Sequence, residues 1–186
     1  MDEEAPKAPE TIRTVDCMFI FDVDGVITNP QEKRVTEPEI LDQIVRRLKN
    51  GEPVALNTGR SLAWMIDRVI NPLLEKVKDK KILQNFFAVG EKGGTWAEFD
   101  EEGNLIESKD NNISVPDDLK NEVRDLIKNN YSDSIFYDES KQTMISTEMI
   151  DGHSLEDYRN KQKILLAQLE TLLANKKLKE KFKVDP

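Results

Sequence analysis

One short segment constrains the fold more than any other. The apolar run from Cys17 to Phe21 leads directly into Asp22-Val23-Asp24-Gly25. An uncharged run of this kind is typical of a strand buried on both faces, as in a parallel sheet covered by helices. Ligands bind at the carboxyl ends of strands in such α/β sheets, so we expect Asp22 and Asp24 at a binding edge. Gly25 allows a sharp turn there. The only cysteine, Cys17, is expected to be a packed thiol.

A second strand is expected at 53–57, and a helix lies between the two. Thr36 and Glu39 have capping-box spacing, Pro38 suits a first turn, and Gly51 ends the helix. Its apolar face consists of Ile40, Leu41, Ile44, Val45 and Leu48. Strand, helix and strand in this length predict a right-handed βαβ unit with parallel strands. The loops that follow the two strands should therefore open on the same edge of the sheet.

The two acids suit phosphoryl transfer. A carboxylate can attack phosphorus and form an aspartyl-phosphate, and Asp22 is the candidate nucleophile. A second acid on a turning backbone can protonate the leaving oxygen and then deprotonate water, a role we assign to Asp24. Two close carboxylates repel each other and a phosphate, so a hard cation such as Mg²⁺ is expected. The alternative interpretation is an acidic turn after a strand.

The sequence after the second strand, Asn57-Thr58-Gly59-Arg60-Ser61, offers partners for a phosphate. Thr58 can donate a hydrogen bond, and Gly59 allows close approach of the backbone. Ser61 can cap the following helix. Arg60 can pair with the phosphate or with another carboxylate. The alternative is an ordinary strand-to-helix turn with a surface arginine.

Together, DVDGV followed by NTGRS resembles the first and second motifs of the haloacid dehalogenase superfamily of phosphotransferases. The resemblance implies a Rossmann-like core with Asp22 as nucleophile and Asp24 as general acid and base. It also implies Mg²⁺ held by the Asp22 carboxylate and the Asp24 main-chain oxygen, with Thr58 on the phosphoryl group. Aspartate at the second acidic position is similar to phosphatases and phosphomutases, and differs from dehalogenases and ion-pumping ATPases.

A third apolar strand is expected at 86–89, followed by Gly90-Glu91-Lys92-Gly93-Gly94. In superfamily members with large caps, a glycine-containing loop after the third strand lies near the substrate. Glu91 and Lys92 are therefore candidate substrate contacts. The alternative is that both are solvated loop charges.

The rest of the chain predicts a hairpin at 96–107 and then a second unit. A helix from Pro116, paired strands at 135–137 and 143–147, and a helix capped by Ser154 resemble the first half of an α+β cap. We expect an N-terminal acidic tail (1–14), an α/β core (15–109) and a partial cap (110–186). Trehalose-phosphate phosphatase, sucrose-phosphate phosphatase, phosphomannomutase and broad-range sugar phosphatases share that layout.

The later lysine and acidic pair of the superfamily have no evident match, so we expect either a fragment or a degenerate member. Exposed sheet edges would then favour self-association or complementation by a missing C-terminal half. Two functions stay open. One is a Mg²⁺-dependent phosphatase of a small phosphorylated metabolite, most plausibly a sugar phosphate, with a phosphomutase as its enzymatic rival. The other is a noncatalytic phosphate-binding or assembly module.

Composition limits the partners. The 186 residues carry a net charge of -9, which opposes binding to nucleic acid or an anionic membrane. The sequence has no apolar run long enough for a membrane span and no secretion signal, so a cytoplasmic protein is expected.

Overall fold

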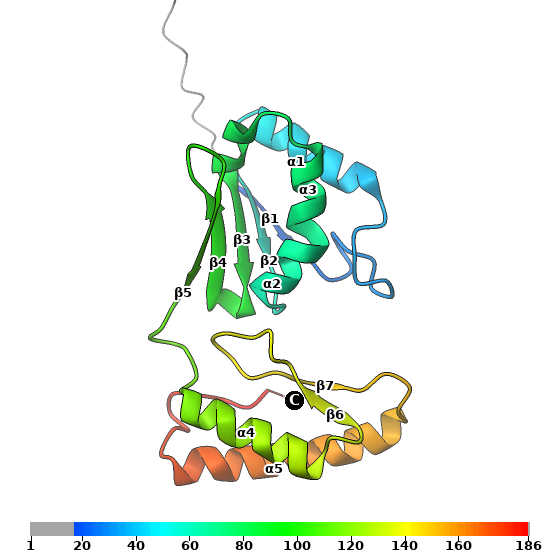
Figure 1. Cartoon of the computed structure of the whole chain (residues 1–186), viewed down its shortest axis with the longest axis vertical. Coiled ribbons are helices and arrows are strands. Elements are labelled where there is room, and N and C mark those ends of the chain that lie inside the picture. The colour runs from blue at the N-terminus through cyan, green and yellow to red at the C-terminus, as the bar shows by residue number, and fades with distance from the viewer. Residues whose placement is uncertain (1–16, 186) are drawn as a thin grey trace, which may run out of the picture. The chain divides into compact units, whose positions relative to one another are not determined.

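A five-stranded sheet organises the first part of the chain in the computed structural model, which describes residues 17–185 (Figure 1). Its strands lie in the order β1-β2-β3-β4-β5. They are β1 (Phe19–Asp22), β2 (Val54–Asn57), β3 (Phe86–Gly90), β4 (Thr95–Phe99) and β5 (Leu105–Lys109). Helices and strands alternate over the first three strands, which confirms the predicted α/β class. The acidic tail predicted at 1–14 falls outside the described residues.

The predicted βαβ unit is present. Strands β1 and β2 pair in parallel, with Phe19 opposite Val54 and Asp22 opposite Asn57. Helix α1 (Pro38–Lys49) connects them and buries Leu41, Ile44, Val45 and Leu48. The predicted capping box is wrong, because residue Glu37 is the N-cap and no side chain caps the helix. Pro38 supplies the fixed backbone angle of the first turn instead. Gly51, with φ of 75°, follows the end of the helix as predicted.

Strand β1 is not buried on both faces, which corrects the prediction from its apolar sequence. It lies at one edge of the sheet. Its residues alternate between partial burial and exposure, and Ile20 is 65% exposed. Cys17 is also exposed rather than packed. Helices α1 and α3 (Asn71–Lys76) lie on the same side of the sheet in Figure 1. Side chains of β1 that point to the opposite side are therefore left open to solvent.

Strand β1 thus combines an edge position with an exposed apolar residue, Ile20. A strand whose outer edge pairs with no other strand among residues 17–185, and which exposes an apolar side chain, favours association with another chain. We propose that β1 mediates self-association, so the mass measured by light scattering should rise with concentration. Ile20→Lys should shift the protein to monomer, because a charge on the exposed side of an edge strand opposes pairing. A monomer mass that is independent of concentration would contradict the proposal.

Three short helical segments follow β2: α2 (Leu62–Met65), a π-helical turn at Ile66–Ile70 and α3. Pro72 lies in the first turn of α3. Its missing amide is tolerated there, because first-turn amides have no partner within the helix. Met65, Val69, Ile70 and Leu73 are fully buried. Short 3-10 helices at Lys80–Asn85 and Glu91–Gly93 flank β3.

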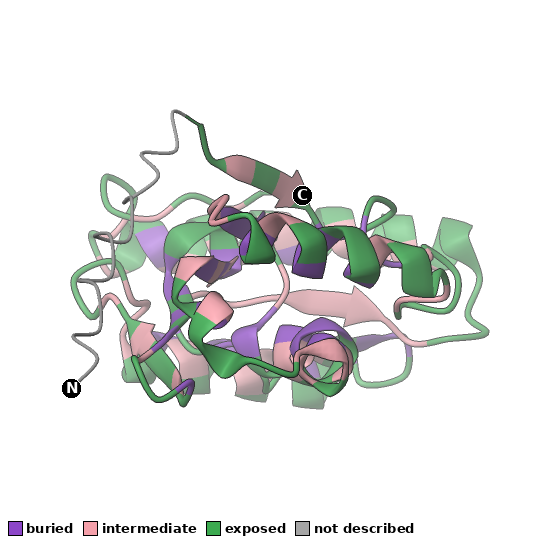
Figure 2. Cartoon of the chain, turned by 90° about the horizontal axis from the view of Figure 1, so that it is seen from above, coloured by how far each residue is buried: buried purple, intermediate pink, exposed green. Residues whose placement is uncertain are grey.

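The second part of the chain has the predicted order helix, strand, strand, helix. It comprises α4 (Asp117–Asn130), β6 (Ile135–Tyr137), β7 (Thr147–Met149) and α5 (Leu155–Asn175). Strands β6 and β7 pair antiparallel. Strand β7 begins later than predicted, because residues 138–146 form a long loop. The Ser154 side chain caps α5 through the Asp157 amide, at 3.4 Å. Figure 2 shows buried segments on helices that expose their opposite faces. The core cluster of this part consists of Leu119, Val123, Ile127, Tyr131, Ile135, Leu165 and Leu173.

Contacts divide the chain into two compact units. The first contains the described residues up to Thr58, together with Ile66–Ala88 and Ala97–Ile106. The second contains Gly59–Met65, Val89–Trp96 and the residues from Glu107 onward. The last of these divisions falls between Ile106 and Glu107. The predicted division into a core and a partial cap at residue 109 stays a prediction.

Candidate functional site

The first candidate residue, Asp22, ends β1 and has an exposed side chain. Its Oδ1 accepts a hydrogen bond of 2.7 Å from the backbone amide of Val23. This bond holds one carboxylate oxygen against the backbone of the following residue. The predicted position of Asp22, at the carboxyl end of a parallel strand, is confirmed.

The loop after Asp22 folds around one carbonyl oxygen. The oxygen of Val23 accepts bonds of 3.0 Å from the amides of Ile27 and Thr28 and from the Thr28 hydroxyl. Val23 itself is fully buried, which anchors the loop in the core. Gly25 adopts a φ of 75°, a conformation that strains a residue with a Cβ. The turn therefore holds Asp24 at the open edge, between a buried anchor and a glycine.

The first and second motifs meet through Thr58. Its hydroxyl donates a hydrogen bond of 3.1 Å to Oδ2 of Asp24. Thr58 is only 5% exposed, so its side chain has little freedom to turn away. The structure thus joins residues 34 positions apart in the sequence, as the parallel βαβ unit predicts. In this arrangement the Thr58 hydroxyl orients Asp24, a contact that the sequence did not indicate.

These residues suit a Mg²⁺ ion. Within residues 17–185 there is no group of three or more His, Cys, Asp and Glu side chains that could hold a metal. Mg²⁺ needs no such group, because it is usually bound through one or two carboxylates, waters and substrate phosphates. Asp22 and Asp24 offer oxygen donors on exposed side chains at one edge. A bound Mg²⁺ would be held by the Asp22 carboxylate and the Asp24 main-chain oxygen, and it would polarise the phosphoryl group.

In the second unit, residues 59–61 form a loop that is fastened at each position. The carbonyl oxygen of Gly59 accepts a hydrogen bond from Nζ of Lys141. Arg60 forms an ion pair of 3.5 Å with Glu148, and its guanidinium lies 5.3 Å from the centre of the Trp64 ring. The Ser61 hydroxyl accepts from the Trp64 amide at 3.2 Å, as expected of a helix cap. Of the two predicted partners for Arg60, the carboxylate is thus seen.

The loop after β3 places its two charged residues differently. Glu91 is 4% exposed, and its carboxylate accepts hydrogen bonds from residues 142–144. Lys92 is exposed and forms an ion pair of 2.7 Å with Asp185. Both residues were predicted as substrate contacts or solvated charges. The burial of Glu91 excludes the solvated-charge interpretation and favours a structural role. The exposed Lys92 agrees with the solvated-charge interpretation.

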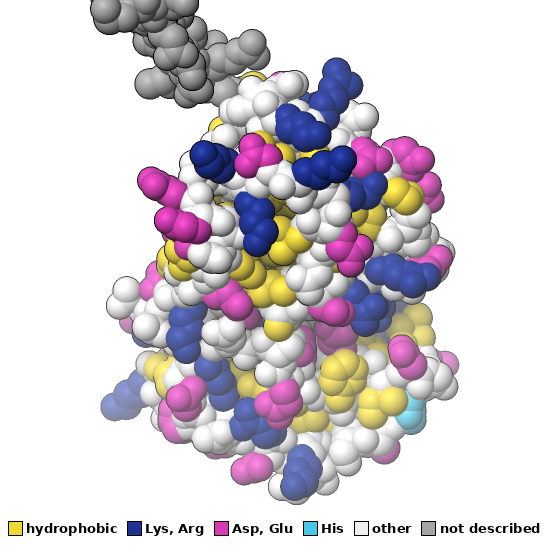
Figure 3. Space-filling view, turned by 45° about the horizontal axis from the view of Figure 1, so that its top comes forward, with side chains coloured by type: hydrophobic (Ala, Val, Ile, Leu, Met, Phe, Trp, Pro, Cys, Tyr) yellow, Lys and Arg dark blue, Asp and Glu magenta, His cyan; other side chains and the backbone are white. Residues whose placement is uncertain are grey.

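The burial of Lys141 was not predicted from the sequence. It is 9% exposed, and burial lowers the pKa of its ammonium group, while the charges of Asp138 and Glu91 oppose that shift. A lysine in a polar loop gives no sequence signal of burial, because the pattern around it has neither helical nor strand periodicity. Figure 3 shows acidic and basic side chains interspersed on one face of the molecule, which illustrates why charge alone did not single it out.

A cavity of about 730 Å³ opens between α4 and α5 and is lined by Leu126, Ile164, Ala167 and Leu172, among others. It contains none of the predicted site residues. No helix in residues 17–185 is long and apolar enough to cross a membrane.

The fold is shared with solved structures of an IMP-nucleotidase. No protein-family model matches the sequence, and the search of curated proteins found no match. An IMP-nucleotidase mutant from Plasmodium falciparum with bound IMP superposes with a TM-score of 0.54 at 15% identity, over 86% of this chain and 47% of that one. The ATP-bound form of that enzyme gives a TM-score of 0.57 at 17% identity, over 86% and 41%. A haloacid dehalogenase-like hydrolase from Bacteroides thetaiotaomicron superposes with a TM-score of 0.47 at 19% identity, over 80% of this chain and 48% of that one.

This chain spans less than half the length of those Plasmodium chains. Identities of this size show a common fold rather than a common activity. The similarities show that this chain shares its fold with the Plasmodium falciparum IMP-nucleotidase structures over 86% of its own length.

Proposed function

We propose that this chain carries the site of a Mg²⁺-dependent phosphohydrolase that acts on a small phosphorylated metabolite through an aspartyl-phosphate. The observation that carries the proposal is the 3.1 Å hydrogen bond from Thr58 to Asp24, beside Asp22 at the end of a parallel strand. A nucleophile and an acid–base group at one open edge, with a hydroxyl fixed by burial, are the parts that this reaction needs.

In the proposed reaction, Oδ2 of Asp22 forms a bond to phosphorus as the ester oxygen leaves. Asp24 gives its proton to that leaving oxygen, so that an alcohol departs. Water then attacks the aspartyl-phosphate, and Asp24 takes a proton from it. The phosphorus–oxygen bond to Asp22 breaks, which restores the carboxylate and releases inorganic phosphate. Thr58 keeps Asp24 oriented, and Gly59 and Arg60, which follow Thr58 directly in the chain, are proposed to bind the phosphoryl oxygens.

The proposed substrate class is supported by the elements of residues 117–175. Their order of helix, strand, strand and helix resembles half of a cap of the sugar-phosphatase type, so we propose a sugar phosphate. The structural neighbours include an enzyme named for IMP, and nucleoside monophosphates therefore belong in the same substrate screen. A cytoplasmic location remains part of this proposal.

The role of Asp24 can be tested by its dependence on the leaving group. Asp24→Asn should lower kcat by about 10²- to 10⁴-fold for a sugar phosphate, because protonation of the leaving alcohol is lost. The loss should be smaller for p-nitrophenyl phosphate, whose leaving group departs without a proton. Steady-state kinetics with Mg²⁺ measure both values. Asp151→Asn, at an exposed turn, is the matched control and should behave as wild type.

Equal losses of kcat for the two esters would contradict the acid–base role of Asp24.

The two alternative functions, a noncatalytic phosphate-binding module and a phosphomutase, predict different results. A noncatalytic phosphate-binding module would bind inorganic phosphate without hydrolysing any ester in the screen. A phosphomutase would return an isomeric phosphate ester instead of free phosphate, which product analysis by ³¹P NMR distinguishes.

A further inference from the structure

Glu91 links three segments of the second unit that are distant in the sequence. Its backbone amide donates a hydrogen bond of 2.9 Å to the carbonyl oxygen of Arg60. Its side chain extends to the loop between β6 and β7. There Oε2 accepts from the Thr143 amide at 2.7 Å and from the Thr143 hydroxyl at 2.8 Å. The amides of Gln142 and Met144 add bonds of 2.9 and 3.3 Å.

A buried carboxylate of this kind must have a specific function in the structure. Burying a charge is costly unless hydrogen bonds replace the water that the charge loses. The donors around Glu91 are backbone amides and one hydroxyl, which form charge-assisted bonds. A glutamine would present an amide nitrogen to amide donors and leave at least one of them without an acceptor. The arrangement therefore requires an acid rather than any polar residue.

The backbone at Glu91 is also held in an unfavourable conformation. Glu91 and Lys92 have φ angles of 52° and 56°, in the left-handed region, and Gly93 follows at 99°. Such a conformation is unfavourable for each residue with a side chain. Contacts elsewhere must offset that cost. The bonds of the Glu91 carboxylate to residues 142–144 are placed to do so.

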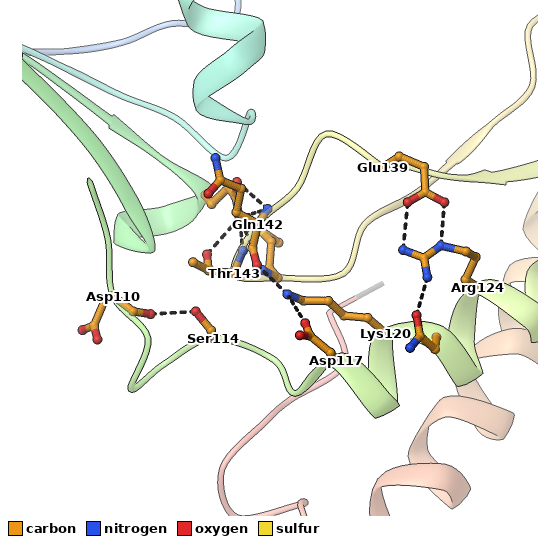
Figure 4. Close-up of polar contacts among 11 residues, drawn as sticks. Asp110, Ser114, Asp117, Lys120, Arg124, Glu139, Gln142 and Thr143 are labelled. Carbon is orange, nitrogen blue, oxygen red and sulfur yellow. Dashed lines mark hydrogen bonds and ion pairs between the residues drawn. The ribbon is translucent and has the colours of Figure 1, made fainter. Parts of the chain in front are cut away.

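The loop that Glu91 binds also contacts α4 and the segment before it. Figure 4 shows side chains of α4 bound to it. Lys120 donates to the carbonyl oxygen of Gln142 at 2.6 Å, and Arg124 binds both carboxylate oxygens of Glu139 at 2.6 and 2.9 Å. The amide of Val115 donates to the carbonyl oxygen of Thr143 at 2.8 Å. Helix α4 and its preceding segment therefore give the loop a fixed support.

The same loop returns to residues 59–61. Lys141, next to Gln142, donates to the Gly59 carbonyl, and the Ser140 and Ser61 hydroxyl oxygens are 2.8 Å apart. We propose that Glu91 is a positioning residue: it locks the 140–144 loop in place, and that loop fixes the position of residues 59–61. That this position serves phosphate binding rests on the proposed function, because residues 59–61 directly follow Thr58.

Hydrogen exchange tests this inference without any enzymatic assay. Glu91→Gln should raise the exchange rates of peptides covering 140–145 and also 59–65 by about tenfold, the loss expected when a charge-assisted hydrogen bond is removed. Peptides from α5 should keep their wild-type protection. Glu98→Gln, the same change at an exposed position of β4, is the matched control and should leave both regions unchanged.

Two further variants keep the test decisive if Glu91→Gln folds poorly. Thr143→Val removes one hydrogen-bond donor to Glu91, so exchange should rise at both 140–145 and 59–65, by less than in Glu91→Gln. Thr143→Ser keeps the hydroxyl and should exchange like the wild type. Lys141→Met should raise exchange at 59–65 alone, because the bonds of Glu91 to 142–144 stay intact. Faster exchange at 140–145 with unchanged exchange at 59–65 in Glu91→Gln or Thr143→Val would overturn the inference.

The link between Glu91 and phosphate binding is tested by a separate measurement of phosphate affinity. Weaker binding of inorganic phosphate to Glu91→Gln, measured by calorimetry, is expected and would be shared by Lys141→Met. Unchanged phosphate affinity together with the two-region exchange pattern would overturn the link to phosphate binding. If the wild-type protein hydrolyses no ester, the proposed function fails, while the exchange pattern still decides whether Glu91 positions the loop.

Discussion

Replacement of Asp22 by Asn is expected to reduce kcat for phosphate ester hydrolysis by on the order of 10³-fold or more, since an amide cannot form the aspartyl-phosphate. The fold should not change. Asp22 is exposed, and an Asn oxygen can still accept the bond that Oδ1 now takes from the Val23 amide at 2.7 Å. The variant is therefore expected to separate chemistry from stability. Turnover and thermal unfolding measured on the same sample check both parts.

The same variant gives a direct sign of the covalent step. Brief incubation of wild-type protein with substrate, followed by an acid quench, should trap a phosphorylated peptide that contains residue 22. The Asn variant should give none. Turnover that persists within tenfold of wild type in Asp22→Asn would remove the basis of the proposed function, whatever the fate of Asp24.

The substitution Gly94→Ala is expected to cause the largest loss of stability of the variants considered. Gly94 has φ of -73° and ψ of -27°, which any residue can adopt, so backbone strain is not involved. The obstacle is steric. A Cβ there would lie 2.8 Å from the Cβ of Thr143 and would overlap its hydroxyl oxygen. Overpacking of this kind costs about 1–3 kcal/mol. Urea unfolding followed by tryptophan fluorescence measures the free energy of unfolding.

A second substitution identifies the cause. Adding Thr143→Gly to Gly94→Ala removes both overlapping atoms, so the double variant should recover part of the stability lost by Gly94→Ala alone. The two free-energy changes would then be clearly non-additive, as expected for residues in contact. Strict additivity, or a Gly94→Ala variant as stable as wild type, would show that the close approach of these two loops is not present in solution.

Much of the site's position was predictable from local pattern. The apolar segments before Asp22 and Thr58, with a helix between them, predicted two parallel strands whose ends share an edge. The structure confirms that arrangement through the pairing of Asp22 with Asn57. Periodicity is informative here because the connection is short and parallel strands with a helical crossover have one favoured geometry.

Other features could not be predicted in this way. The sequence of β1 is apolar enough for a central strand, but it lies at an edge and leaves Ile20 exposed. Apolar runs report the preference of a strand for burial and not which neighbours are present to bury it. The burial of Glu91 and Lys141 was also hidden, because their partners are backbone groups in loops without periodicity.

The sequence by itself determined the α/β class, the strand ends that present Asp22, Asp24 and Thr58, and the helical and strand order of the second unit. All of these follow from hydrophobic periodicity and turn residues, which act over a few neighbouring positions. Only the tertiary structure decided that Thr58 donates to Asp24, that Glu91 is bound by residues 142–144, and that Lys141 contacts Gly59. Those contacts join segments up to 82 residues apart, and a hydrogen bond forms only where packing brings its donor and acceptor within about 3 Å.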